Sequence, residues 1–268
     1  MHGDSAFTIG KSHRVCQDYA QHGPNYAIVS DGCSGSPDTD IGARLLVLGV
    51  EAHFIYGGGL NAGAVGWALN RAGAALADMR RFPDITLPNP LDATLLAVQV
   101  AESRYSVVVA GDGAVGFRYL DGGIGSIRVT FPGGAPAYPT YRLSNSRREA
   151  YEQAQPLGRE VVCRGASGPI LAGLPSSSRD TDPFTPWCFS ANAPWPESVA
   201  VFSDGIESFH DAEGTQIAPW RIVEELMAFK TYPGAFVQRR VHAFLRDCAA
   251  RGWTHHDDLA MAAVYLGG

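Results

Sequence analysis

The chain has 268 residues, of which 46% are hydrophobic and 18% charged, so it can bury a sizeable core. Its 27 acidic and 21 basic residues give a net charge of −6, and no basic stripe suggests a nucleic-acid partner. The longest apolar stretches are interrupted by Arg44, Glu51 and His53, so the sequence predicts no membrane span.

The cysteines and the N-terminus bear on the cellular compartment. The five cysteines are odd in number, widely scattered and without a C-x-x-C pair, which argues against a disulfide framework or a zinc ribbon. Residues 1–4 lack the basic and apolar regions of a signal peptide. We therefore expect a reducing, cytoplasmic location.

The hydrophobic pattern predicts a regular succession of elements in chain order. Strands are expected at 25–31, 93–100, 104–111, 114–120, 198–203 and 259–266. Helices are expected at 39–56, 63–81, 145–155, 219–230 and 234–250. The first helix has N-terminal signals at Asp38, Thr39 and Asp40. Residues 121–195 are rich in glycine and proline, and we expect a flap or insertion within them.

This order of elements predicts a fold class. Two helices lie between the early strands, two more precede the last strand, and the strands in between follow one another like hairpins. Such an order is typical of an α+β layered sandwich. We expect one domain that spans residues 1–268.

Acidic residues follow three apolar runs, each time as Asp-Gly: at Asp31, Asp112 and Asp204. The pair Asp257-Asp258 stands just before the last strand. Asp-Gly is also a common turn after a strand. For Asp112 a hairpin turn is as good an interpretation as a functional site, because residues 114–120 could return as its second strand.

A sheet places strand ends side by side, so acids at those ends can converge. Converging carboxylates repel one another unless cations neutralise them. Mg²⁺ and Mn²⁺ are hard cations that prefer such oxygen ligands. A glycine lets the backbone come close, so the Gly32 carbonyl is a further candidate ligand.

Several short motifs in order along the chain resemble those of the protein phosphatase 2C (PPM) family, in its compact bacterial branch. They are Gln17-Asp18, Val29-Ser30-Asp31-Gly32, Gly111-Asp112-Gly113, Phe202-Ser203-Asp204-Gly205 and Asp257-Asp258-Leu259. The resemblance extends from about Gly10 to Leu266. It implies a four-layer αββα sandwich, with two central and mainly antiparallel sheets flanked by helices.

The resemblance also implies a metal site that holds two, and with Asp112 three, Mn²⁺ or Mg²⁺ ions. Asp31 would bridge two metals, and the Gly32 carbonyl would bind one of them. Asp204 and Asp257 would complete the other metal's shell. Asp18 would ligate a metal or orient water bound to it, and Asp112 would serve the third, weaker site. Thr94 matches a threonine position beside the site, with its role left open.

Two positions depart from the family pattern. The family's phosphate-binding arginine, five residues before the Asp18 position, is His13 here, and Arg14 comes one residue later. Either side chain could bind phosphate. Eukaryotic members carry a histidine after Asp-Gly, whereas this chain, like bacterial members, lacks it and has Cys33 and Ser34.

Other motifs carry less weight. The G-x-G-x-x-G pattern at 111–116 is followed by a predicted strand, whereas dinucleotide binding needs a helix there. No G-x-S-x-G elbow is present. The pair His255-His256 could suggest zinc, but no cysteine or further histidine stands nearby at ligand spacing. Cys33 is either an oxidation-sensitive thiol near the metals or a structural one.

The function implied by the resemblance is hydrolysis of phosphoserine and phosphothreonine in proteins by a hydroxide that bridges the metals. The catalytic residues would be His13, Arg14, Asp18 and Asp31, and the substrate a phosphoprotein of a cognate Ser/Thr kinase. Nucleic acid and membrane are not expected as partners. Two alternatives stay open: a non-catalytic phosphoprotein-binding regulator, which would usually have lost some of these acids, and a phosphatase of small molecules.

Overall fold

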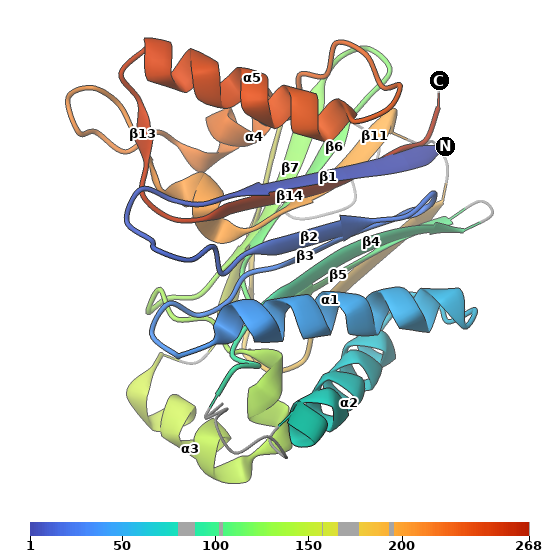
Figure 1. The fold of residues 1–268 in the computed structure, drawn as a ribbon, viewed down its shortest axis with the longest axis vertical. Coiled ribbons are helices and arrows are strands. Elements are labelled where there is room, and N and C mark those ends of the chain that lie inside the picture. Colours follow the sequence, from blue (N-terminus) through green and yellow to red (C-terminus); the bar gives the residue numbers. More distant parts are fainter. Residues whose placement is uncertain (80–88, 102–103, 157, 166–176, 193–195, 268) are drawn as a thin grey trace.

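Two antiparallel sheets lie face to face in this protein, and helices cover their outer faces (Figure 1). The structure is a computed structural model that describes residues 1–79, 89–101, 104–156, 158–165, 177–192 and 196–267. The four-layer αββα sandwich of the α+β class, expected from the sequence, is confirmed. No helix in these ranges is long and apolar enough to cross a membrane.

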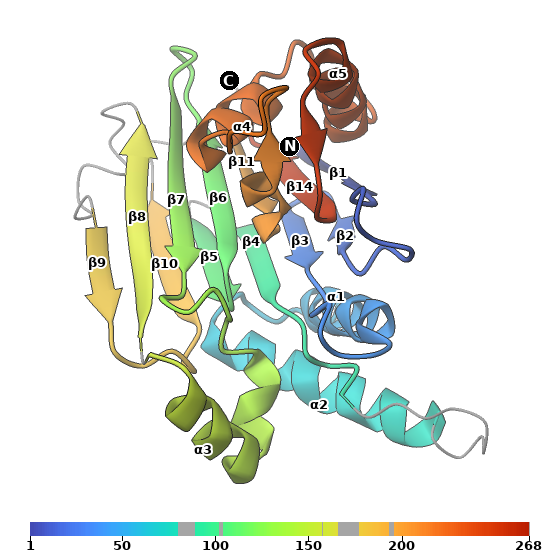
Figure 2. The same ribbon diagram turned by 90° about the vertical axis from the view of Figure 1, so that its left-hand side faces the viewer.

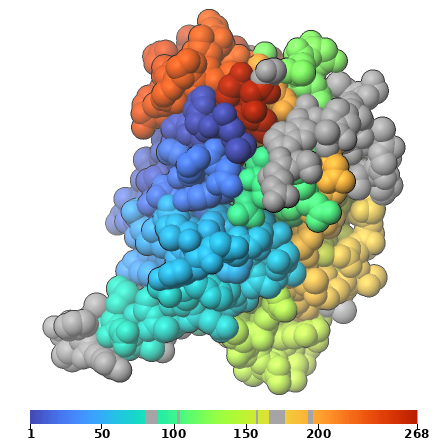
Figure 3. Space-filling model, turned by 90° about the vertical axis from the view of Figure 1, so that its right-hand side faces the viewer, coloured from blue at the N-terminus to red at the C-terminus, as the bar shows by residue number. Residues whose placement is uncertain are grey.

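The first sheet has five strands and carries α1 (Thr39–Ile55) and α2 (Ala62–Met79) on its outer face. Its strands, in spatial order, are β10 (Trp187–Asn192), β5 (Arg104–Ala110), β4 (Leu95–Ala101), β3 (Tyr26–Ser30) and β2 (Tyr19–His22). All five residues of β3 are buried, because one face packs on α1 and the other on the second sheet. On the face in Figure 3, the two helices lie below the N-terminal strands.

The second sheet has seven strands and joins the two ends of the chain. Its strands, in spatial order, are β1 (His2–Thr8), β14 (Leu259–Tyr265), β11 (Ser198–Phe202), β6 (Gly113–Arg118), β7 (Ile124–Thr130), β8 (Arg159–Gly165) and β9 (Ser177–Asp180). The antiparallel pairing of His2 with Tyr265 sets both termini beside each other, as Figure 1 shows. Valines and alanines of both sheets fill the space between them.

Helices α4 (Pro219–Met227) and α5 (Phe236–Ala250) cover part of the outer face of the seven-stranded sheet. Ala235, at the N-terminus of α5, offers no capping side chain. Asp4 of β1 supplies one instead, since its Oδ2 accepts hydrogen bonds from the backbone N–H groups of Val237 (2.6 Å) and Gln238 (3.0 Å). A carboxylate at a helix N-terminus also interacts favourably with the helix dipole.

The regular elements lie close to their predicted places, but three parts differ from the expectation. The strands β1 and β2 were not predicted, and residues 80–81 of the second predicted helix lie outside the described residues. Asp38 stands at the N-terminus of α1, yet its side chain makes no capping hydrogen bond. Its backbone adopts the left-handed conformation (φ 59°), which aspartate tolerates better than most residues.

The span 121–195 contains more regular structure than its composition indicates. It contributes β7, β8 and β9 to one sheet and β10 to the other, together with the 3-10 helix η1 (Pro139–Leu143) and α3 (Asn145–Ala154). Figure 2 places η1 and α3 at one end of the strands. Residues 157, 166–176 and 193–195 of the expected flap are outside the described residues, so the flap stays a prediction.

Candidate metal centre

Three aspartates from different strand ends meet at one edge of the sandwich. Asp31 directly follows β3, Asp112 lies between β5 and β6, and Asp204 begins the short 3-10 helix η2 (Asp204–Glu207) after β11. Each offers one carboxylate oxygen, and these oxygens lie within 4.8 Å of one another. The structure thus brings together three of the acids that the sequence singled out, and we call them the aspartate cluster.

The backbone around Asp112 is a crossing between the two sheets. β5 pairs with β4 and β10, whereas β6 pairs with β11 and β7, so the hairpin interpretation of Asp112-Gly113 is wrong. Gly111 (φ 96°) and Gly113 (φ 126°) both adopt conformations that favour glycine. A Cβ atom on Gly113 would lie 2.6 Å from the Phe202 carbonyl oxygen. Two glycines therefore let the chain change sheets within three residues and point Asp112 into the cluster.

Thr94 fixes the backbone of Asp31. The Asp31 N–H donates to Thr94 Oγ1 (3.1 Å), and the Thr94 N–H donates to the Asp31 carbonyl oxygen (2.8 Å). An isolated bridge between Gly32 and Ala93 continues this pairing beyond β3. The structure thereby supplies a positioning role for Thr94, which the sequence had left open.

Asp18 is almost fully buried, with 1% of its surface exposed. Within the described part of the chain, neither of its carboxylate oxygens has a hydrogen-bond donor in good geometry, and the same holds for Asp112 Oδ1. Buried polar atoms normally have partners, because an unpaired one costs free energy. Carboxylate oxygens left in this state beside other carboxylates fit a cation, which is attracted to them and needs no hydrogen bond.

Burial and mutual repulsion raise the pKa values in this region. Burial, and next the charge of Asp204, hold the pKa values of Asp31 and Asp112 well above the usual range. Burial also raises the pKa of Asp18 to about 8, and burial together with the charge of Asp257 raises that of Asp204 to about 6. No lysine or arginine within the described ranges pairs with these four acids. Among the described residues the charge of His13 is the positive one that acts on Asp204, and bound cations would supply more.

Asp257 and Asp258 play different structural parts. Asp257, with 44% of its side chain exposed, is not among the three residues of the cluster, although its charge raises the pKa of Asp204. Asp258 is buried and accepts backbone N–H bonds from Gly10 (2.7 Å) and Gln17 (2.6 Å). It thus fastens the loop that leads to Asp18. In the sequence Asp258 stands out only as part of the pair Asp257-Asp258, because an anchoring role has no local signal.

His13 and Arg14 differ sharply in their surroundings. His13 Nδ1 lies 3.0 Å from Asp258 Oδ2 and its Nε2 lies 3.4 Å from Asp257 Oδ1. Burial lowers the pKa of His13, but the contact with Asp258 and its charge outweigh burial and leave the pKa raised. Arg14 is exposed and makes no ion pair or hydrogen bond with the described residues. Of the two candidates for phosphate binding, Arg14 is the one whose charge has no partner in the part of the chain that the structure describes.

Comparisons with known proteins rest on structure alone. No protein-family model matches the sequence, and a search of curated proteins finds no match. Solved structures do match over nearly their whole length. The serine/threonine phosphatase PstP of Mycobacterium tuberculosis is 17% identical with a TM-score of 0.55, covering 100% of this chain and 99% of its own. Its catalytic domain, at the same identity and TM-score, was solved in complex with two manganese ions, with 98% and 96% covered.

The PPM Ser-Thr phosphatase MsPP of Mycobacterium smegmatis, solved with cacodylate, is similar to the same degree. It is 15% identical with a TM-score of 0.54, and the match covers 100% of this chain and 99% of that chain. At such identities the likeness establishes the fold. The chain therefore has the fold of the bacterial PPM Ser/Thr phosphatases, and its aspartate cluster lies at the strand ends of that fold.

Proposed function

We propose that this protein is a metal-dependent phosphatase that hydrolyses phosphoserine and phosphothreonine in proteins. The observation that carries the proposal is the aspartate cluster, with an oxygen of Asp31, Asp112 and Asp204 within 4.8 Å of one another in a chain of PPM fold. A non-catalytic regulator would not need to keep such mutually repelling carboxylates together. Their retention favours an enzyme.

The residues present fit divalent cations. Asp18, Asp31, Asp204, Asp257 and the Gly32 carbonyl would hold two Mn²⁺ or Mg²⁺ ions, and Asp112 would serve a third. The two manganese ions of PstP support this number. When bound, such ions act as Lewis acids that activate water and balance the charge of phosphoryl oxygens. Such a cation would satisfy the Asp18 and Asp112 oxygens that have no hydrogen-bond partner among the described residues.

The chain's own side chains would divide the remaining tasks. Arg14 would bind the phosphoryl oxygens, since its guanidinium group is exposed and unpaired among the described residues. His13 would hold Asp257 and Asp258 in place through its two ring nitrogens. Thr94 would keep Asp31 directed at the cluster. We further propose that a cognate Ser/Thr kinase supplies the substrate and that both act in the cytoplasm.

An assay with two substrates tests this function. A chromogenic phosphoester and a phosphothreonine peptide are incubated with protein stripped of metal by EDTA, and again after addition of Mn²⁺ or Mg²⁺. We expect no turnover without metal and recovery of turnover with it. Full activity after verified metal removal would exclude the proposed chemistry. If the protein hydrolysed the ester but not the peptide, that result would instead support a phosphatase of small molecules.

A further inference from the structure

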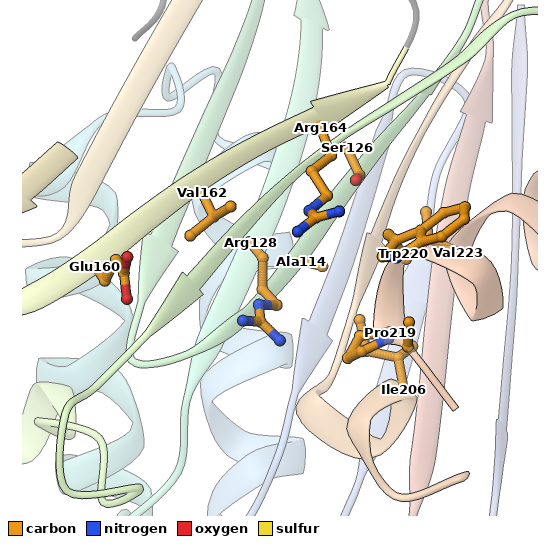
Figure 4. A pocket seen from close by; sticks show the side chains of 11 residues that line it. Ala114, Ser126, Arg128, Glu160, Val162, Arg164, Ile206, Pro219, Trp220 and Val223 are labelled. Atoms are coloured by element: carbon orange, nitrogen blue, oxygen red, sulfur yellow. The ribbon is translucent and has the colours of Figure 1, made fainter. Parts of the chain in front are cut away.

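A pocket of about 370 Å³ lies on the outer face of the seven-stranded sheet, between β7–β8 and the start of α4 (Figure 4). We call it the sheet-face pocket and define it by Arg128, Val162, Arg164, Ile206, Pro219 and Trp220. It does not contain any of the acids of the aspartate cluster. The large exposed side chain of Trp220 forms one wall, and 40% of its surface is accessible.

The strand register explains why the arginines share this face. Side chains alternate between the two faces of a strand, so Arg128 points outward between the buried Ile127 and Val129. Ser126 of β7 pairs with Arg164 of β8, and Arg128 pairs with Val162 two positions along. Pairs separated by two positions lie on one face. Both guanidinium groups therefore stand over the same patch, as Figure 4 shows.

Small residues on the neighbouring strand leave the pocket open. Arg128 pairs with Ala114 of β6, and Ser126 pairs with Gly116, so the floor beside the arginines has almost no side-chain volume. Helix α4 covers Gly116 through Val223 and Met227 but leaves its first turn, at Pro219 and Trp220, as the pocket's wall. The result is a hollow with an apolar side and a cationic side.

The charge of the pocket is complementary to an acidic ligand. Arg128 has one ion pair, with Glu207 at 3.4 Å. Arg164 is exposed and has no ion-pair partner among the described residues, in a chain of net charge −6. Glu160 also lines the pocket, but it stands four residues from Arg164 along β8, or roughly 13 Å at the usual strand rise. Glu160 is opposite Thr130, two positions from Arg128 on the same face, so Arg128 has acids near it and Arg164 is the guanidinium group without one at such spacing among the described residues.

The pocket adjoins the aspartate cluster. Ala114 follows Asp112 by two residues and Ile206 follows Asp204 by two, so both lining residues belong to the segments that carry the cluster. Glu207, the partner of Arg128, adds to the charge that Asp112 and Asp204 experience. Arg128 pairs with Ala114 of β6, two residues beyond Asp112. Arg164 pairs with Ser126 of β7, which in turn pairs with Gly116 of β6, four residues beyond Asp112.

We propose that the sheet-face pocket binds acidic residues of the phosphoprotein substrate, at about two to four positions from the phosphorylated residue. An extended peptide rises about as much per residue as a strand, so a peptide with its phosphate at the cluster would bring such residues to Arg128 and Arg164. Trp220 and Pro219 would contact the apolar part of the same segment. This inference rests on the phosphatase function proposed above and assigns its substrate class.

Charge reversal at Arg164 tests the proposal. The kcat/KM of the Mn²⁺-loaded protein is measured for two phosphothreonine peptides, one with glutamates and one with lysines at positions two and four from the phosphothreonine on either side. We expect the parent to prefer the acidic peptide. Arg164→Glu replaces an attraction with a repulsion, so its kcat/KM for that peptide should fall about tenfold and the preference should reverse. The chromogenic ester, which has no flanking residues, should be hydrolysed at the parental rate.

Arg104→Glu is the matched control, because Arg104 is likewise an exposed strand arginine, but in the five-stranded sheet. It should leave the peptide preference unchanged. A second readout is independent of turnover: the binding of a fluorescent acidic peptide without phosphate, by anisotropy, which should weaken in Arg164→Glu and not in Arg104→Glu. Two results would overturn the pocket assignment. One is a parent protein that hydrolyses the ester but has equal kcat/KM for the two peptides, and the other is an equal loss of kcat/KM for the acidic peptide in Arg164→Glu and Arg104→Glu. Failure of ester hydrolysis in the parent would instead overturn the proposed function, and the anisotropy result would still decide the pocket.

Discussion

At the scale of single residues, some acids meet at the cluster, whereas another accepts hydrogen bonds from the backbone and so fixes a loop. Asp31, Asp112 and Asp204 form the cluster, whereas Asp258 is engaged by the backbone N–H groups of Gly10 and Gln17. The distinction follows from partners. An acid with two N–H donors is satisfied without a cation, and an acid beside other acids is not.

Asp31→Asn isolates the charge of the central cluster residue. Asparagine has nearly the same size as aspartate but removes one repelling charge, so the variant should unfold at the same or a higher temperature than the parent in EDTA. Mn²⁺ should raise the free energy of unfolding of the parent by about 2.7 kcal/mol at a metal concentration of a hundred times Kd, and that of the variant by less. Its phosphatase activity should be nearly absent. Melting curves and rates, with and without Mn²⁺, give all three results.

Asp121→Asn is a suitable control, because Asp121 is an exposed turn residue whose Oδ1 accepts a hydrogen bond from Gly123. It should retain both activity and the full Mn²⁺ effect. If Asp31→Asn retained them too, Asp31 could not be the bridging ligand.

Arg14→Ala tests the phosphate contact. Loss of a charged contact to the phosphoryl group in the transition state should cost about 2–4 kcal/mol in kcat/KM, by analogy with lost oxyanion donors. His13→Ala should act differently, because His13 contacts Asp257 and Asp258: its main effect should be a higher Mn²⁺ concentration for half-maximal activity. Mn²⁺ titrations and inhibition by inorganic phosphate distinguish the two variants: His13→Ala should change the first, and Arg14→Ala the second. Parental kinetics and parental phosphate inhibition in Arg14→Ala would assign the phosphate contact to another residue.

At the scale of elements, short connections decide where the acids lie. The segment Gly111–Gly113 carries the chain from one sheet to the other, and only its two positive φ angles allow so short a crossing. Asp92 ties further segments to this end of the sheets: it accepts two hydrogen bonds from Arg147 of α3, each of 2.7 Å, and one from Thr140 of η1. The elements around the cluster are thus fixed by backbone geometry and by one partly buried ion pair.

Gly113→Ala should destabilise the protein more than a comparable change elsewhere. Alanine would be strained at the φ of 126°, and its Cβ would lie 2.6 Å from the Phe202 carbonyl oxygen. That oxygen cannot move without disturbing β11. Gly122→Ala provides the control, since Gly122 also has a positive φ (84°) but open space around it. Its cost should be about 1–2 kcal/mol, the strain of a left-handed conformation alone. Chemical denaturation of both variants measures the difference, and equal losses would show that the crossing is not sterically constrained.

At the scale of the whole molecule, the cluster couples stability to metal and pH. It joins β3 and the β5–β6 crossing to β11, so its repulsion acts across the interface between the two sheets. Carboxylates with raised pKa values favour the folded state while they are protonated. That contribution is complete below their unfolded pKa of 3.8 and is lost as the pH rises through the folded values, about 6 for Asp204 and about 8 for Asp18.

The metal-free protein should therefore become less stable as the pH rises from about 4 to 8. Mn²⁺ should oppose this trend, because it binds the deprotonated carboxylates and so stabilises the folded state more strongly at higher pH. Melting temperatures in EDTA and in Mn²⁺ across this range provide the measurement. The Asp31→Asn variant should show a shallower fall in EDTA. A melting temperature that rose with pH in EDTA would contradict burial and mutual repulsion as the cause of the raised pKa values.

The sequence by itself determined the regular elements and marked the acids at the strand ends as candidates for a site. Strand and helix periodicity is a local property, so α1, α2, α4, α5 and the central strands lie within a few residues of their predicted places. The acids at the strand ends are also visible in the sequence, but it left Asp112 open to a hairpin turn and grouped Asp257 with Asp31 and Asp204, whereas the cluster contains Asp31, Asp112 and Asp204. Only the tertiary structure decided that Gly111–Gly113 crosses between sheets, that Asp258 anchors the loop from Gly10 to Gln17, and that Asp4 caps α5. Asp258 and Asp4 act on partners more than 200 residues away along the chain. Such partners are chosen by the packing of the layers, which no local pattern contains.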